Sequence, residues 1–292
     1  MSGGPQARVV VAGSVTIDDT RVAGRRYRKL GGVPAYAGLT YVREGIAAAL
    51  VANVAACDAD LLAVFAAEGL QTAWGATEHT TRFVNRVEHD GRRQQLRTTA
   101  RPIAYVAMAR AAAAAAWVHL GPLHPDDLHA EVYDQLAAAC IPVVLDLQGL
   151  VRETRRGKVL PRASHLLPFA LRAAAIVKTS HRERQIVQDA LGASVDRLME
   201  RFAIDEWVST DGARGGCIHV RGREAVPYAA RPAGALDPTG AGDVFLAAYA
   251  AARLGRNAPV AAAGRHASAV AARQVAGRHI PFELLQLPDG RR

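Results

Sequence analysis

Residues 237–249 read DPTGAGDVFLAAY, and this stretch decides the fold more clearly than any other part of the 292-residue chain. Three small residues, Gly240, Ala241 and Gly242, precede an apolar run with helical spacing. Small residues let the backbone approach a ligand closely, and the free N–H groups at the start of a helix attract anions such as phosphate. The stretch therefore predicts a helix start that binds a phosphate group.

Asp243 stands in the first turn of this predicted helix. Because a carboxylate repels phosphate, direct binding of phosphate does not explain its position. It fits a general base that removes the proton from a hydroxyl group as the hydroxyl attacks a phosphorus atom. For the short Gly-x-Gly-Asp motif alone, an ordinary glycine turn with an acidic residue at a helix start remains the alternative.

Short apolar runs alternate with helical stretches along the rest of the chain. We expect buried strands at residues 9–13, 51–54, 117–120, 143–147, 176–178, 207–210 and 217–220, and helices at 34–50, 58–69, 126–139, 183–191, 239–255 and 260–275. Residues 80–96 instead alternate between apolar and polar side chains around an Asp-Gly turn, which predicts a β-hairpin. Strands that alternate with helices predict an α/β fold, with a mostly parallel sheet and helices on both of its faces.

The charge balance is basic, with 36 Lys and Arg against 27 Asp and Glu and a formal net charge of +9. Such a surplus suits nucleic acid, an acidic membrane surface or a phosphorylated small molecule as partner. However, only Lys29, Lys158 and Lys178 are lysines, so an arginine-rich composition explains most of the charge. We therefore expect no nucleic-acid partner. The 50% hydrophobic content excludes a wholly disordered chain.

Cysteine usage and hydropathy bear on the compartment. Cys57, Cys140 and Cys217 are far apart and lack histidines at metal-ligand spacing, which predicts a reducing environment without disulfides or a zinc site. The most apolar long stretch, residues 104–120, contains Arg110 and His119 and falls short of a membrane span. We expect a cytoplasmic protein with no membrane partner.

The stretch at 237–249 resembles the C-terminal signature of the ribokinase-like (PfkB-type) carbohydrate kinase family. Other segments match in the order that the family has them: Gly13-Ser14 with Asp18, the LGG of residues 30–32, the hairpin at 80–96, and VSTDGARGG at 208–216. The resemblance covers nearly the whole chain. It implies one domain, residues 1–292, folded as a three-layer α/β/α sandwich with a mostly parallel central sheet, and a small β lid formed by about residues 15–32 and 75–104.

Three further segments resemble the myo-inositol kinase branch of that family: VVLDLQGLVR at 143–152, HLLP at 165–168 and IPF at 280–282. They imply an ATP-dependent kinase that phosphorylates a hydroxyl of myo-inositol or a related cyclitol. A nucleoside or other sugar kinase of the same family is the alternative. A catalytically silent regulator that binds nucleotide or polyol is an alternative of a different class.

The resemblance also implies roles for individual residues. Asp243 would be the catalytic base, and Asp18 and Gly32 would hold the substrate. Tyr36 stands near the place where many sugar kinases carry asparagine, so it either reshapes the substrate pocket or is a core aromatic residue. The backbone amides of three residues would form an anion hole for the transferred phosphoryl group: Gly240, Ala241 and Gly242. The residues that would border the ATP are Thr210, Gly212, Gly215, Gly240 and Gly242.

Magnesium is the second cofactor that the resemblance implies. Glu183 would organise Mg²⁺ through water, but Ser180 replaces the asparagine of the family's Asn-x-x-Glu motif. A monovalent cation is a further candidate cofactor, and the protein would be a monomer or a homodimer.

Other polar residues have open or structural interpretations. Asp146 ends an expected strand at the edge where α/β proteins bind ligands, so it either faces substrate or phosphate, or caps the next segment. His119 follows an apolar strand and is expected to be structural. The basic and aromatic run at residues 25–29 is expected to be a lid strand with a solvated face.

Overall fold

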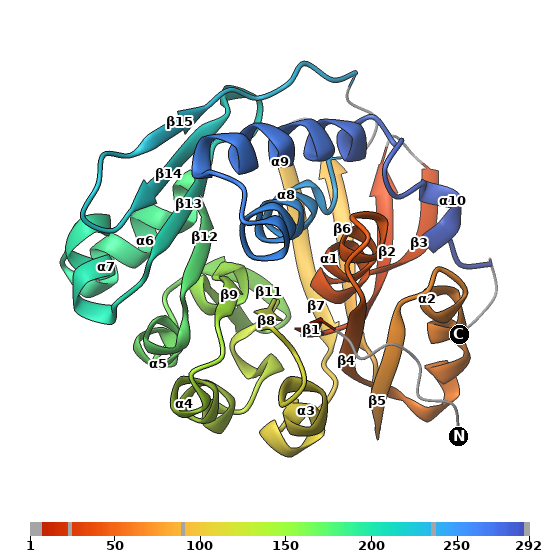
Figure 1. The fold of residues 1–292 in the computed structure, drawn as a ribbon. Helices are drawn as coiled ribbons and strands as arrows, with labels where there is room; N and C mark the ends of the chain where they lie inside the picture. Colours follow the sequence, from red (N-terminus) through yellow and green to blue (C-terminus); the bar gives the residue numbers. More distant parts are fainter. Residues whose placement is uncertain (1–7, 23–24, 89–90, 235–237, 289–292) are drawn as a thin grey trace.

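A computed structural model describes residues 8–22, 25–88, 91–234 and 238–288 and contains a central sheet of nine strands (Figure 1). The strands from β13 to β5 run parallel, whereas β14 and β15 are antiparallel at one edge. In spatial order they are β15 (Val226–Tyr228), β14 (Gly216–Val220), β13 (Glu206–Thr210), β12 (Ile176–Ser180), β9 (Val143–Asp146), β8 (Trp117–Leu120), β1 (Val9–Ala12), β4 (Ala48–Ala55) and β5 (Gln71–Thr77).

Helices cover both faces of this sheet, so the expected three-layer α/β/α sandwich is confirmed (Figure 1). One face carries α1 (Val33–Arg43), α8 (Ala241–Ala250) and α9 (Val260–Val275). The other carries α3 (Tyr105–Ala112), α4 (Ala130–Ala139), α5 (Leu167–Ala173), α6 (His181–Leu191) and α7 (Val195–Phe202). Strand β1 shows why both faces must be covered: Val9 and Val11 belong to the apolar cluster beneath α1 and α8, and Val10 and Ala12 to the opposite cluster.

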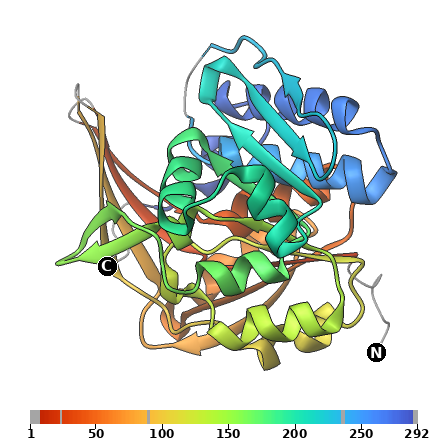
Figure 2. The same ribbon diagram turned by 90° about the vertical axis from the view of Figure 1, so that its left-hand side faces the viewer.

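A second sheet projects from the sandwich (Figure 2). Its strands, in spatial order, are β10 (Arg152–Arg155), β11 (Lys158–Pro161), β7 (Gly91–Thr98), β6 (Thr81–Glu88), β2 (Thr16–Val22) and β3 (Arg25–Gly31). The hairpin of β10 and β11 belongs to this sheet and was not expected from the sequence. Two turn positions expected at His89 and Asp90 lie outside the described residues, as does Asp237.

Several expected helix boundaries were wrong, for local reasons. The helix expected at 34–50 ends at Arg43, and Gly45 follows with φ +73°, a left-handed conformation that ends helices readily. Ala48 and Ala49 beyond it belong to β4. The helix expected at 58–69 begins as a 3₁₀ turn, Ala56–Leu62, followed by the short α2 (Ala63–Ala67). Helices α3 and α5 were not expected, because alanine-rich or short segments carry weak periodicity. Helix α7 was not expected either, although its buried residues Val195, Leu198, Met199 and Phe202 have clear helical spacing.

The basic run at residues 25–29 was also misjudged at one position. Lys29 is only 3% exposed, so the expectation of a solvated face is wrong for this residue. Neighbouring strand residues point to opposite sides, and Lys29 points into the molecule, with its Nζ 5.6 Å from the ring centre of Phe282. Phe282 belongs to α10 (Phe282–Leu285), which lies beside β3.

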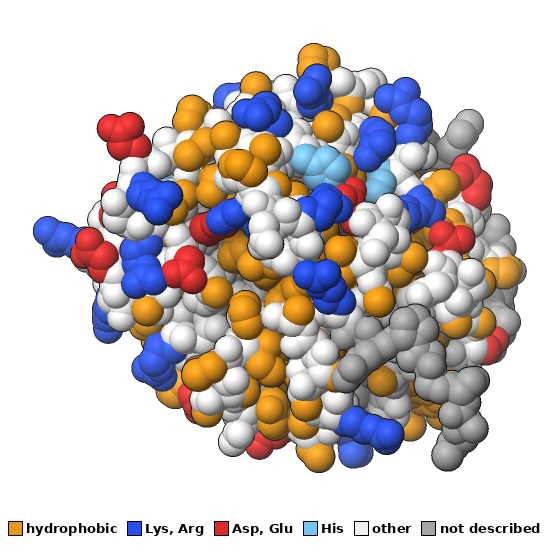
Figure 3. All heavy atoms as spheres, viewed as in Figure 1, with side chains coloured by type: hydrophobic (Ala, Val, Ile, Leu, Met, Phe, Trp, Pro, Cys, Tyr) orange, Lys and Arg blue, Asp and Glu red, His pale blue; other side chains and the backbone are white. Residues whose placement is uncertain are grey.

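The molecular surface gives no sign of one concentrated basic patch on the face drawn in Figure 3. Lys and Arg side chains are spread over this face among hydrophobic and uncharged groups. The distribution agrees with a basic surplus that comes from composition. Within the described ranges, no helix combines the length and the apolar character that crossing a bilayer requires.

Candidate active site

A polar cavity of about 270 Å³ connects the predicted phosphate-binding helix start to the second sheet. Its walls come from segments far apart in the sequence, and they include Asp243, Gly240, Asp18, Gly32 and Tyr36, all predicted from the sequence. The other lining residues are Thr16, Phe83, Gln94, Leu123, Gln148, Arg152 and Thr239. The fold thus assembles the predicted base, one member of the predicted anion hole and the predicted substrate-binding residues around one space.

A helix begins at the glycine turn, as the sequence predicted, but one of the three predicted anion-hole donors already has a partner. Gly240 is the N-cap of α8 with φ +75°, and the N–H of Ala241 donates to the carbonyl of Pro238 at 3.2 Å. A Cβ at Gly240 would lie 2.3 Å from Cδ1 of Tyr36, so only glycine fits. Tyr36 is 3% exposed, as expected for a core aromatic residue, and it also lines the cavity, so a role in shaping the substrate pocket stays a prediction.

The opposite wall is built on β2 and the turn into α1. The hydroxyl of Thr16 donates to Oδ1 of Asp18 at 2.9 Å and fixes the orientation of this carboxylate. Gly31 and Gly32 allow the chain to pass close by. A Cβ at Gly31 would lie 2.7 Å from Oδ2 of Asp18, and one at Gly32, where φ is +90°, would lie 2.0 Å from the carbonyl oxygen of Ser14.

Asp146 and Lys178 form a buried ion pair behind Asp243. Lys178 Nζ donates to Oδ2 of Asp146 at 2.8 Å, and Oδ1 of Asp146 accepts the N–H of Gln148 at 3.0 Å. Asp146 therefore caps the next turn, which was one of the two roles predicted for it. It also pairs with the buried ammonium group of Lys178. A Cβ at Gly242 would lie 2.9 Å from Lys178 Nζ, so this ammonium group packs against the predicted anion hole.

Electrostatics prepare Asp243 to accept a proton. Burial raises the pKa of Asp243, the negative charge of Asp146 raises it further, and the cations of Lys178 and Arg152 partly oppose both effects. The net result raises the pKa of Asp243 to about 7. A carboxyl group with a pKa near neutrality is well matched to general acid–base work.

Lys178 experiences the complementary effects. Burial by itself would lower the pKa of Lys178, but the carboxylates around it outweigh burial, with Asp146 the strongest, and hold that pKa above its usual value. Lys178 therefore stays charged at all ordinary pH values. Sequence reasoning did not single out this lysine, because its partner lies on a different strand.

Three further lining residues were also missed. Gln94 on β7 donates from Nε2 to Oδ1 of Asn85 at 3.0 Å, which orients its amide. Gln148 and Arg152 come from the turn after β9 and the start of β10. Arg152 acts electrostatically on Asp243, but in the sequence it stood out only as the last residue of the segment 143–152 that resembles a kinase branch.

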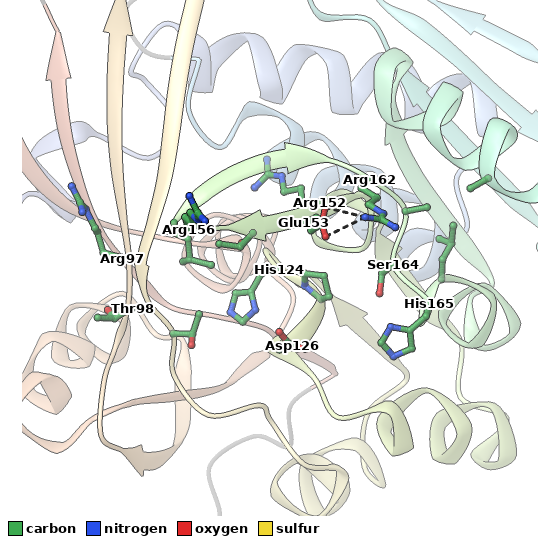
Figure 4. A pocket seen from close by; sticks show the side chains of 18 of the residues that line it. Arg97, Thr98, His124, Asp126, Arg152, Glu153, Arg156, Arg162, Ser164 and His165 are labelled. Carbon is green, nitrogen blue, oxygen red and sulfur yellow. Dashed lines mark hydrogen bonds and ion pairs between the residues drawn. The ribbon is translucent and has the colours of Figure 1, made fainter.

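A larger cavity of about 1090 Å³ lies beneath the β10–β11 hairpin, and Arg152 lines both cavities (Figure 4). His124 and Asp126 lie below the hairpin, and Ser164 and His165 lie to one side. Much of the charge here is paired internally, since Arg162 donates to Glu153 at 3.3 Å. This larger cavity contains neither Asp243 nor the glycine turn, so we place the reacting groups in the smaller one.

The residues predicted to border a nucleotide lie in two places. Gly240 and Gly242 stand at the start of α8, where Gly240 lines the smaller cavity, whereas Thr210, Gly212 and Gly215 lie at the end of β13 and in the loop that follows it, outside the walls of that cavity. Thr210 ends β13, and Gly212 and Gly215 flank a 3₁₀ turn. Tyr228 lies close to this loop: a Cβ at Gly215 would lie 2.3 Å from its carbonyl oxygen. Its ring packs on that of Phe245 with centres 4.8 Å apart.

Ser180 and Glu183, the pair considered for magnesium, form a capping box at the start of α6. The N–H of Ser180 donates to Oε2 of Glu183 at 2.7 Å, and the N–H of Glu183 donates to Oγ of Ser180 at 3.3 Å. Within the described ranges, no group of three or more His, Cys, Asp or Glu side chains is arranged to hold a metal ion.

Comparisons with known proteins agree with this geometry. The family model described as "pfkB family carbohydrate kinase" matches residues 28–279. Among solved structures, a sulfate complex of a pyrophosphate-dependent kinase in the ribokinase family superposes with a TM-score of 0.82 at 20% identity, covering 91% of this chain and 95% of that one. A complex of such a pyrophosphate-dependent kinase with a pyrophosphate analog and myo-inositol gives 0.81 at 19% identity, covering 91% and 94%.

A nucleoside kinase is also similar. The enzyme of Burkholderia thailandensis, in complex with inosine, superposes with a TM-score of 0.75 at 19% identity and covers 93% of each chain. No curated protein matches the sequence significantly. At these identities the structural likeness establishes the fold, and the family model adds the class of protein.

Proposed function

The chain belongs to the pfkB family of carbohydrate kinases, and from that premise we propose that its acceptor is myo-inositol or a related cyclitol. As a member of that family it is a phosphotransferase that uses a hydroxyl group as acceptor. The observation that carries the proposal is the small polar cavity in front of Asp243. Its volume of about 270 Å³ is below the roughly 300–1,000 Å³ of pockets for drug-sized ligands, which favours a single small ring.

The chemistry of the walls supports a polyol. Asp18 accepts hydrogen bonds from hydroxyl groups, and the amides of Gln94 and Gln148 both donate and accept. Arg152 offers several donors in a fixed plane. A ring that carries a hydroxyl on every carbon satisfies such a wall from several sides, whereas the base of a nucleoside needs a larger apolar surface.

The reaction follows from the positions of the groups. The acceptor hydroxyl lies beside Asp243, which takes its proton while the hydroxyl oxygen bonds to phosphorus and the bond from phosphorus to the donor's leaving oxygen breaks. The amide N–H groups of Gly240 and Gly242, together with that of Ala241 once it leaves the carbonyl of Pro238, bind the charge on the transferred phosphoryl group. The Lys178 ammonium group adds positive charge behind this anion hole.

Magnesium fits this site as an ion carried by the donor. Glu183 at the start of α6 would hold it. The contact would run through water, because the Glu183 carboxylate already caps this helix. When bound, Mg²⁺ supplies neutralisation of the phosphate charge. The sheet that contains β2, β3, β6 and β7 would act as a lid over the acceptor.

The donor has two candidates. ATP is the expectation from the family, with Thr210, Gly212 and Gly215 along its path. Inorganic pyrophosphate is the second candidate, because two of the similar structures are described as pyrophosphate-dependent kinases.

A matrix of donors and acceptors tests this function. Purified, folded protein would be incubated with ATP or pyrophosphate and with myo-inositol, other inositols, nucleosides or hexoses, and phosphorylated products would be identified by mass spectrometry. We expect the highest kcat/KM with a cyclitol. Faster turnover of a nucleoside or a hexose would contradict the acceptor. Calorimetric binding without any transfer would favour the silent regulator.

The pH dependence provides a second test, of the environment of Asp243. Because Asp243 must be unprotonated to act as base and has a pKa of about 7, we expect kcat/KM to fall about tenfold per pH unit below that value. Replacing Asp146 by Asn removes a negative charge that raises this pKa, so the acidic limb should move to lower pH. Profiles of both proteins between about pH 5 and 9 measure this. An unmoved limb in the variant would show that Asp146 does not influence the base.

A further inference from the structure

The loop that carries the anion hole is fastened by a buried glutamine. Gln274 on α9 is only 4% exposed, and its Nε2 donates to the carbonyl of Thr239 at 3.3 Å. Its Oε1 accepts the N–H of Ile280 at 3.0 Å. One side chain thus joins the residue before Gly240 to the segment that follows α9.

Both partners fix the orientation of this amide. The carbonyl of Thr239 can only accept a hydrogen bond, and the N–H of Ile280 can only donate one. The Gln274 amide must therefore direct its nitrogen to Thr239 and its oxygen to Ile280. A carboxylate at the same position would keep the bond from Ile280 and lose the bond to Thr239.

The bond to Thr239 controls the direction of an anion-hole donor. The carbonyl of Thr239 and the N–H of Gly240 belong to one planar peptide group and point in opposite directions. Fixing the carbonyl therefore fixes the line along which the Gly240 N–H points. Because anion-hole donors act only when they are aimed at the phosphoryl oxygens, Gln274 acts on the reaction through Gly240 without touching a substrate.

A buried lysine lies beside Gln274. Lys29 lines a small cavity together with Gln274 and Tyr36, and its Nζ lies 5.9 Å from the centre of the Tyr36 ring. The cavity, about 20 Å³, has room for little more than one water molecule. The ring of Tyr36 in turn packs against Gly240.

We propose that Gln274 is a positioning residue of the anion hole, which acts through the direction of the Gly240 N–H and not through contact with a substrate.

Hydrogen–deuterium exchange tests the positioning without any substrate. Gln274→Glu keeps the acceptor for Ile280 and removes the donor to Thr239, and Gln286→Glu places the same charge change on an exposed side chain of the C-terminal segment. We expect amides in the peptide covering residues 238–250 to exchange about tenfold faster in Gln274→Glu and unchanged in Gln286→Glu. Exchange at the wild-type rate in Gln274→Glu would overturn the positioning role.

Kinetics provide the second readout and rest on the proposed function. With a phosphorylated acceptor in hand, Gln274→Glu should lower kcat by about 10- to 100-fold with little change in either KM, and Gln274→Asn should recover part of the loss. An unchanged kcat in Gln274→Glu, or a loss that appears only in KM, would contradict the positioning role. If no acceptor is found, the proposed function fails while the exchange result still decides the role of Gln274.

Discussion

Replacing Asp243 by Asn is expected to lower kcat about a thousandfold while leaving acceptor and donor binding nearly unchanged. The amide has almost the shape of the carboxylate, but it cannot take the proton from the attacking hydroxyl. Steady-state kinetics measure kcat, and calorimetry with the acceptor measures binding. Retained turnover would mean that a different residue is the base.

The thermal stability of Asp243→Asn shows whether its loss of activity comes from misfolding. The pKa of Asp243 is raised in the folded protein, so its carboxyl group is neutral at low pH, and its charge increasingly costs stability as pH rises from about 4 to about 7. Asn carries no charge at any pH. Asp243→Asn should therefore melt above the wild type at pH 8 and together with it at pH 4. A variant that melts below the wild type at pH 8 would contradict the buried, charged environment assigned to Asp243.

Replacing Gly240 by Ala is expected to lower kcat about 100-fold, the usual cost of losing one donor of an anion hole. The new Cβ would lie 2.3 Å from Cδ1 of Tyr36, and Gly240 has φ +75°, which alanine adopts only with strain. The turn must shift, and its N–H groups then miss the phosphoryl oxygens. Kinetics at saturating donor and acceptor measure the loss.

Gly222 provides the matched control for backbone strain. It has φ +69°, and nothing lies within 4 Å of a Cβ built there. Gly222→Ala should therefore cost stability similar to the strain at Gly240 and leave kcat unchanged. Because the clash involves Tyr36, the pair Gly240→Ala and Tyr36→Ala should lose less activity together than the product of the single losses. Fully independent effects would argue against the contact.

The sequence predicted the fold well because the buried strands are nearly pure apolar runs. Val9–Ala12 and Val143–Asp146 could hardly be anything else once the glycine turn at 240–242 was recognised. Helix boundaries were predicted less well, since alanine suits both a helix end and a buried strand. The β10–β11 hairpin was missed because its strands have only four residues each and most of their side chains are polar or exposed, so no clear alternation marks them.

The site was predictable where one short segment carries its chemistry and unpredictable where separate segments meet. Asp243 and Gly240 stand in one motif, and the structure places them in the cavity with Asp18. The Asp146–Lys178 pair needs two strands to come side by side, and the Gln274–Thr239 bond needs α9 to lie against the start of α8. No local pattern contains that information, and for Lys29 its basic neighbours suggested exposure.

Phosphorus NMR on wild type and Asp243→Asn, with myo-inositol and either ATP or pyrophosphate, tests the proposed reaction most directly. The wild type should produce a phosphomonoester signal with at least one donor, and the variant should produce almost none over the same time, although it is folded and binds myo-inositol. No phosphomonoester from folded wild type with either donor, or equal production by the variant, would contradict a cyclitol kinase that uses Asp243 as its base.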